Sequence, residues 1–207
     1  SVNLQADWLE QQKTESALYL AARSHSGSEG LFLALLAKPS VLAANARWAG
    51  TPLMLACRAG YAQAARQLLE SGDPNEGSET TPLLVASRCG HAHVVKELLR
   101  ANVDVLQANK LGDTALHEAA RQGHADCVRL LLQEGFPVNA QTSVGVTALH
   151  LGCSNVAVLK ELLQHPGINI TLQSRCLARP IDVARKRGCD ASVSLLEQHE
   201  HMMRHSY

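Results

Sequence analysis

Aromatic residues are scarce in this chain of 207 residues, which has two Trp, two Phe and three Tyr. The apolar content, 46% of the sequence, is carried mainly by Ala and Leu instead. Ala and Leu favour helices, whereas strands are enriched in β-branched and aromatic residues. The composition therefore favours short, closely packed helices over a β-sandwich.

An excess of either charge is also missing, because 19 Lys and Arg balance 19 Asp and Glu. Bulk binding to nucleic acid or to anionic membranes requires a basic excess, so neutrality argues against both. The longest apolar run, residues 31–37, is too short to span a bilayer, and no signal-peptide pattern is present. The chain begins with Ser1 rather than Met, so we expect an excised domain.

Motifs for metal binding and catalysis are absent from the sequence. The six cysteines form no CxxC pair, which favours buried thiols in a reducing cytoplasmic or nuclear compartment. No phosphate-binding glycine loop, HExxH or GxSxG occurs. The tail histidines His199, His201 and His205 lack a Cys or carboxylate at a zinc-binding spacing. We therefore expect no enzymatic activity, no cofactor and no metal.

The chain does contain a repeated phrase, in which Thr is followed by Pro or Ala, then Leu, then small residues. Four copies begin at Thr51, Thr81, Thr114 and Thr147, and a degenerate copy begins at Arg179. The intervals are 30, 33, 33 and 32 residues. A fixed period in this range indicates a repeat array, which offers a long surface rather than a buried catalytic pocket.

Residues 109–141 hold the most regular copy. Residues 109–113 have the composition of a turn, and Thr114 is a candidate N-cap for a first helix. Gly123 is predicted to end this helix in a left-handed conformation, and Gly135 stops a second helix. Neither helix is long enough to be stable alone. Each copy is therefore predicted to be two short antiparallel helices with a protruding turn, stabilised by stacking.

Two segments resemble the ankyrin repeat: GDTALHEAARQGHADCVRLLLQEGFPVNA, residues 112–140, and TTPLLVASRCGHAHVVKELLRANVDV, residues 80–105. Their Thr-Pro-Leu-type, Gly-His and Leu-Leu elements stand at the family's offsets. The resemblance implies an all-α ankyrin repeat solenoid with atypical capping repeats, forming a single domain over residues 1–207. About six helix-turn-helix copies are expected, at approximately residues 12–46, 47–76, 77–109, 110–142, 143–174 and 175–207.

Three copies depart from the regular pattern. The first has an insertion at residues 24–30, and the second is three residues shorter in its trailing segment. The fifth is two residues shorter between its helices, where residues 153–156 replace the usual Gly-His turn. Asn155 is expected to take the left-handed position of the missing glycine. We expect local irregularity at all three places.

The resemblance implies structural roles for four histidines. His117 and His150 occupy the family's Thr-Pro-Leu-His position, where the imidazole bonds backbone groups between repeats. His91 and His124 follow the helix-ending glycines and are interpreted as structural too.

The resemblance also implies that a ligand meets the concave side, made by turn tips and by the exposed side of each first helix. An arginine stands at one fixed offset in the first four copies: Arg23, Arg58, Arg88 and Arg121. We call these residues the Arg register. It breaks at Ser154 and resumes at Lys186. Because neighbouring repeats stack about 10 Å apart, the register is expected to line one groove.

The turn tips add further candidate binding residues. The basic and aromatic ones are Arg47, Trp48, Lys110 and Arg175, and Leu111 and Val144 provide an apolar rim. Arg offers a planar fork for carboxylates, and Trp and Arg are frequent hot spots. The sequence thus predicts a monomeric protein-interaction module that binds a partner peptide, acidic or carboxylate-bearing, along the concave face.

Two alternatives stay open. The arginines could be solvated helix residues whose field is cancelled by acidic neighbours, such as Glu76, Glu79, Asp113 and Glu118. The chain could also be a domain-docking regulator, such as an inhibitor or a substrate receptor of a ubiquitin ligase, which would use a larger and flatter contact.

Overall fold

The computed structural model of the protein describes residues 18–22, 29–37, 52–71, 80–101, 103–104 and 106–205. Regular structure in these residues is helical, apart from one isolated antiparallel bridge between Gln141 and Thr147. Residues 18–22 are helical, and α2 (Glu29–Leu36) follows them.

The remaining helices come in pairs, a first helix followed by a second. The first helices are α4 (Pro52–Ala59), α6 (Pro82–Cys89), α8 (Ala115–Gln122), α10 (Ala148–Gly152) and α12 (Pro180–Lys186). The second helices are α5 (Ala62–Ser71), α7 (Ala92–Arg100), α9 (Ala125–Gln133), α11 (Val156–Leu163) and α13 (Asp190–His205).

Local signals in the sequence begin and end these helices. Pro82 and Pro180 stand at the first helical position, where an amide would have no helical partner. The Thr81 hydroxyl accepts a hydrogen bond from the Leu84 amide at 3.3 Å. Gly90 closes α6 with φ of 78°, a conformation that a Cβ would strain.

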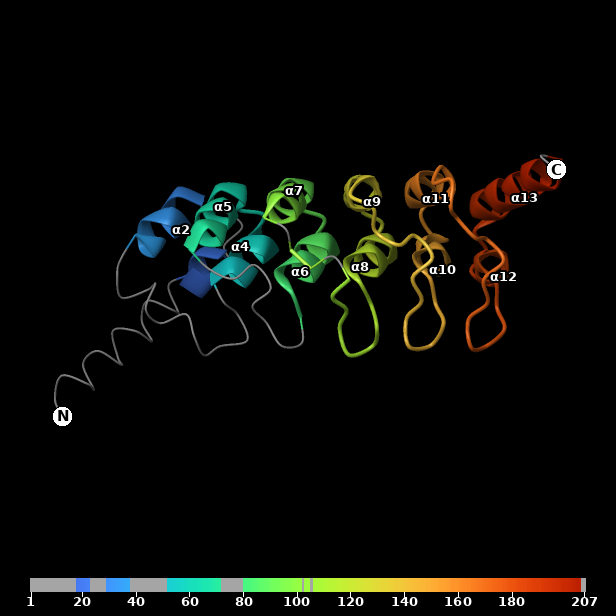
Figure 1. The fold of residues 1–207 in the computed structure, drawn as a ribbon, viewed down its shortest axis with the longest axis horizontal. Helices are drawn as coiled ribbons and strands as arrows, with labels where there is room; N and C mark the ends of the chain where they lie inside the picture. The colour runs from blue at the N-terminus through green and yellow to red at the C-terminus, as the bar shows by residue number, and fades with distance from the viewer. Residues whose placement is uncertain are drawn as a thin grey trace.

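The pairs stack into an elongated array of two layers (Figure 1). Each first helix packs on the next, α4 on α6, α6 on α8, α8 on α10 and α10 on α12, and the second helices pack on one another likewise. The turns before α8, α10 and α12 project on the side away from the second helices. The all-α solenoid predicted from the sequence is confirmed.

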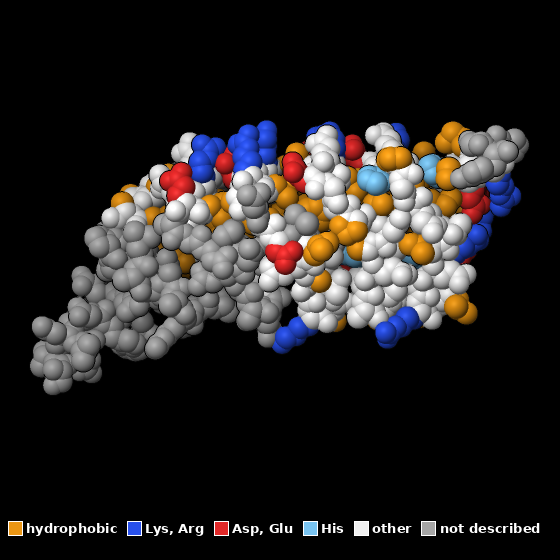
Figure 2. All heavy atoms as spheres, viewed as in Figure 1, with side chains coloured by type: hydrophobic (Ala, Val, Ile, Leu, Met, Phe, Trp, Pro, Cys, Tyr) orange, Lys and Arg blue, Asp and Glu red, His pale blue; other side chains and the backbone are white. Residues whose placement is uncertain are grey.

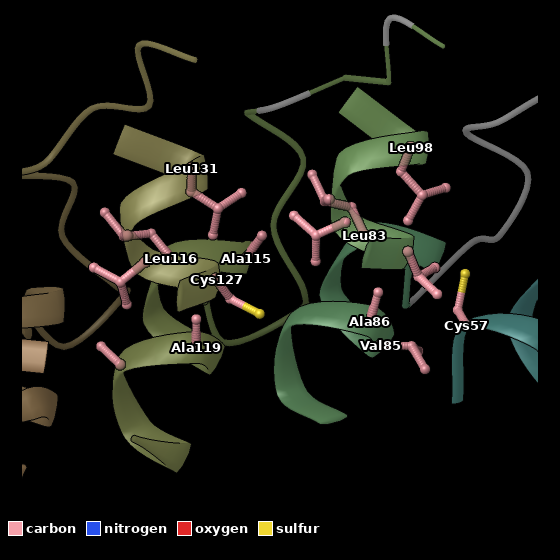
Figure 3. Close-up of a cluster of buried hydrophobic side chains, with 14 of the residues drawn as sticks. Cys57, Leu83, Val85, Ala86, Leu98, Ala115, Leu116, Ala119, Cys127 and Leu131 are labelled. Atoms are coloured by element: carbon pink, nitrogen blue, oxygen red, sulfur yellow. The ribbon is translucent and has the colours of Figure 1, made fainter. Parts of the chain in front are cut away.

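The core lies between the two layers and repeats from copy to copy (Figure 3). Its members in two adjacent copies include Leu83, Ala86, Leu98, Leu116, Ala119, Cys127 and Leu131. Burying a leucine contributes about 1.5–3 kcal/mol. Helices of eight or nine residues, such as α6 and α7, depend on this burial because they are too short to be stable alone.

The fifth copy is irregular, as expected, but not in the predicted way. Gly123 and Gly135 are left-handed as predicted, with φ of 85° and 81°. Asn155, in contrast, is extended, with φ of −128° and ψ of 109°, so the left-handed prediction for it is wrong. The shortened connection leaves α10 only five residues long. Asn155 instead caps α11, accepting bonds from the Ala157 and Val158 amides at 3.0 and 3.2 Å.

Candidate partner-binding surface

Two buried histidines fix the turns beside the first helices. The Thr114 amide donates to Nδ1 of His117 at 3.2 Å, so Nδ1 is an acceptor and the proton resides on Nε2. That Nε2 faces the carbonyls of Ala140 and Val146, in the next turn, at 3.0 and 3.1 Å. Burial lowers the His117 pKa and so favours this neutral form.

His150 repeats the arrangement one copy later, and His91 and His124 make the equivalent ties at the other end of the first helices. Nε2 of His150 lies 3.0 Å from the Ala178 carbonyl. Nε2 of His91 lies 3.0 Å from the Arg58 carbonyl, and Nε2 of His124 lies 3.1 Å from the Arg88 carbonyl. The structural roles predicted for the four histidines are confirmed.

Three members of the Arg register lie at equivalent places in the fold. Arg58, Arg88 and Arg121 occupy the last turns of α4, α6 and α8, three first helices that pack in succession. All three are exposed. The histidine ties described above hold the backbone of Arg58 and Arg88, so the side chains project from fixed points.

The charges of these arginines are not equivalent. Arg121 pairs with Asp113 at 2.8 Å and with Glu118 at 3.0 Å, and both carboxylates are buried. Two carboxylates and one guanidinium leave this cluster with a net charge of −1. Within the part of the chain that the structure describes, the Arg58 and Arg88 side chains make no ion pair. The free positive charge of the described register therefore belongs to Arg58 and Arg88.

After α8, the register position is occupied by Ser154 and Lys186 instead of arginine. The Ser154 hydroxyl accepts a hydrogen bond from the Arg187 guanidinium at 3.0 Å, so this side chain is bonded to the last copy. Lys186 is exposed at the end of α12. The candidates Arg23, Arg47 and Trp48, and the acidic Glu76 and Glu79, lie outside the described residues.

The turn tips form a separate exposed row, joined by backbone hydrogen bonds. Leu111 is 64% exposed and Val144 is 51% exposed. The Ser143 amide donates to the Leu111 carbonyl at 3.0 Å, and the Arg175 amide donates to the Val144 carbonyl at 2.9 Å. Adjacent turns are thereby fixed to one another, and basic side chains lie at their free edge in Figure 2.

The turn at residues 174–178 holds Leu177, which the sequence reasoning missed. This leucine is 74% exposed and is left-handed, with φ of 58°, a conformation that among the described residues it shares only with glycines. Gly112 and Gly145 occupy the same place, two residues before Thr114 and Thr147, as Leu177 does before Arg179. The signal in the sequence that could have predicted this turn is a leucine at the position where the two preceding copies have glycine.

None of the described helices has the length and the apolar character that a bilayer span requires. The same residues bring no three His, Cys, Asp or Glu side chains together as potential metal ligands.

The family model for ankyrin repeats, three copies in length, matches residues 18–109 and again residues 83–174. The chain therefore belongs to the ankyrin repeat family, and the resemblance read from the sequence is confirmed. Ankyrin repeats are protein–protein interaction repeats, so the chain is an interaction module in general. A search of curated proteins found no match to the chain.

Proposed function

We propose that this chain binds an acidic linear segment of a partner protein along the exposed side of its first helices. The observation that carries the proposal is the placement of Arg58 and Arg88, two exposed guanidinium groups that make no ion pair with the described residues, at equivalent points of adjacent helices. Guanidinium groups bind carboxylates through two parallel hydrogen bonds, which gives both affinity and orientation.

The spacing of the arginines suits an extended segment. Packed helices lie about 8–10 Å apart, and an extended segment in the polyproline II conformation rises about 3.1 Å per residue with about three residues per turn. Carboxylates three residues apart therefore lie on one face of such a segment and would reach Arg58 and Arg88 together. The next position along the array is the cluster of Arg121 with Asp113 and Glu118, whose net negative charge disfavours a third carboxylate. The partner segment is thus expected to carry a neutral or basic residue there.

The other predicted binding residues extend this surface in the proposal. Arg23, Arg47 and Trp48 would continue it toward the N-terminus, and Lys110, Leu111 and Val144 would flank it at the turn tips. In this proposal the protein acts as a monomer and catalyses no reaction. All six cysteines are free, which supports a reducing cytoplasmic or nuclear location.

Selection from a library of random linear peptides tests the proposal. Peptides with acidic residues at three-residue spacing should be enriched on the wild-type protein and should bind the R58A/R88A variant about tenfold or more weakly. The matched control is K96A/R204A, which removes two exposed cations from the second helices. Acidic peptides that bind R58A/R88A as tightly as wild type would contradict the proposal.

A domain-docking regulator, such as an inhibitor or a ubiquitin-ligase substrate receptor, is the second candidate function. The hydrogen bonds between the turns at Leu111, Ser143, Val144 and Arg175 favour it, because they create a rigid edge suited to a folded surface. A partner that binds as an intact domain but not as any of its peptides would support this alternative.

A further inference from the structure

We infer that this protein has two oxidation sites, at each of which a peroxide links two neighbouring copies through a disulfide bond. The sites are two cysteine pairs, Cys57 with Cys89 and Cys153 with Cys189. The inference goes beyond the proposed function and does not depend on it, because it concerns the interfaces between copies and not the surface that meets a partner.

The second pair lies where α10 packs on α12. The Cys153 side chain is fully buried, and its sulfur lies 3.1 Å from the Pro180 carbonyl in the first turn of α12. The Cys189 amide donates to the Ala184 carbonyl at 3.0 Å, which closes the same helix. Pro180 and Ala184 are one helical turn apart, so both cysteines are held beside the same part of α12.

The first pair has a similar arrangement where α4 packs on α6. Cys57 stands six residues after Thr51, as Cys153 does after Thr147, and it is also fully buried. The Cys57 side chain therefore faces α6, as that of Cys153 faces α12. Cys89 is the last residue of α6 and is partly exposed.

The two thiols of each pair are close enough to influence each other's ionisation. Burial raises the pKa of Cys57, and the neighbouring Cys89 raises it further. Burial raises the pKa of Cys153 to about 12, although Arg187 opposes this, and Cys189 again adds to the rise. Charges within about 4–6 Å have such effects, and bridged cysteines have Cα atoms about 4.4–6.8 Å apart. Each pair thus has the proximity that a bridge requires.

The difference in exposure assigns a role to each thiol. Cys89 and Cys189 are partly exposed, so peroxide reaches them first. Their sulfur attacks one peroxide oxygen, the O–O bond breaks, and a sulfenic acid and one water form. The buried partner thiol then attacks the sulfenic sulfur, the S–O bond breaks, and the disulfide forms with release of a second water.

In this reaction two thiols are oxidised to one disulfide, and one peroxide is reduced to two waters. The raised pKa of the buried thiol slows the second step, since the thiolate is the nucleophile. The step is nevertheless intramolecular and its target is held in place, which raises the effective concentration of the two sulfurs.

The other interfaces between first helices lack such a pair. The position of Cys57 holds Ser87 in the third copy and Ala120 in the fourth. Oxidation would therefore link α4 to α6 and α10 to α12, but not α6 to α8 or α8 to α10. Each bridge would close a loop of about one repeat, which disfavours the unfolded chain.

The test is to treat the dilute full chain with hydrogen peroxide, block the remaining thiols in denaturant and map disulfide-linked peptides by mass spectrometry without reduction. We expect the two pairs above, and dithiothreitol should separate them. The thermal midpoint of the oxidised chain should be higher than that of the reduced chain by about 5 °C or more. The same oxidation in urea should give mixed pairs that include Cys127, because the native positions are lost.

Cys57→Ala and Cys153→Ala separate the two sites, and both variants should fold because the fourth copy has alanine at this position. Each should abolish only its own bridge, to Cys89 or to Cys189. Cys127→Ala is the matched control, since it removes a buried thiol outside both pairs and should leave both bridges unchanged. A pair that gives no bridge in the folded chain, or that forms no more often than the mixed pairs in urea, overturns the inference for that site.

Discussion

The side-chain amide of Asn155 donates to the carbonyl of Gly123 at 3.2 Å, while its oxygen caps α11. One residue thus joins two repeats and begins a helix. In the regular copies the tie to the preceding repeat is made by a histidine, as in His124 to Arg88.

The Asn155→Ala variant should unfold with a free energy lower by about 1–2 kcal/mol, because the helix loses its N-cap and the repeats lose a hydrogen bond. Asn155→Asp keeps the cap oxygen and should lose less. Asn155→Gly separates the two interpretations of this position: a left-handed residue would be stabilised by glycine, whereas the extended backbone predicts a loss. Chemical denaturation measures all three, and a stabilised glycine variant would contradict the observed geometry.

The register arginines should differ in what they contribute to stability. Arg121→Ala would leave the buried carboxylates of Asp113 and Glu118 without their cation, so we expect a loss of about 1–3 kcal/mol in the free energy of unfolding. Arg88→Ala removes an exposed side chain with no described ion pair and should change stability by no more than about 0.5 kcal/mol. Equal losses in the two variants, measured by urea unfolding, would argue against the charge difference within the register.

Acid should destabilise the array through His117 and His150. Burial holds the pKa of both imidazoles below the ordinary value, so the unfolded chain takes up protons first as the pH falls below about 6.5. The stability from the neutral imidazoles is complete above that pH and is lost as the pH falls to the lowered pKa. The slope is at most about 1.4 kcal/mol per pH unit for each histidine.

Thermal unfolding of wild type and of H117Q/H150Q between about pH 7 and pH 5 measures this effect, because glutamine has a donor but does not titrate. The double variant should show a shallower dependence on pH. Identical slopes would mean that other groups titrate in this range.

The three buried thiols and the one exposed thiol should differ in reactivity. Burial raises the pKa of Cys57, of Cys127 to about 11 and of Cys153 to about 12, so these thiols are both neutral and inaccessible. Cys176 is exposed at a turn tip. Brief treatment with iodoacetamide should therefore modify Cys176 and spare the three buried thiols, as peptide mass spectrometry would show. Urea should abolish the difference, and early labelling of Cys127 in the folded protein would contradict its burial.

The sequence predicted the fold because the signals involved are local and repeated. Gly123 and Gly135 follow their helices at fixed offsets, and the buried leucines recur with the helical period. The left-handed prediction for Asn155 was wrong because it rested on residue type alone. The two deleted residues remove the left-handed turn itself, so the asparagine begins the next helix instead of ending the previous one.

The candidate site was less accessible from the sequence. The sequence identified Asp113 and Glu118 as acidic neighbours of the register. That both pair with Arg121 depends on side-chain directions, which only the folded turn defines. The left-handed backbone of Leu177 was not predicted, because its copy has Arg179 where the others have Thr and a leucine where the two preceding copies have glycine. The exposure of Leu177 and its positive φ are properties of the folded turn, so they are seen only in the structure.

The hydrogen bonds described between copies join immediate neighbours and no others, as in His91 to Arg58 and His150 to Ala178. The protein thus behaves as a line of coupled units, in which cooperativity is transmitted only through successive interfaces. Amides of α8 and α9, flanked on both sides, would exchange with solvent more slowly than those of α13. A weakened interface at Asn155 would divide the line into two blocks that open independently.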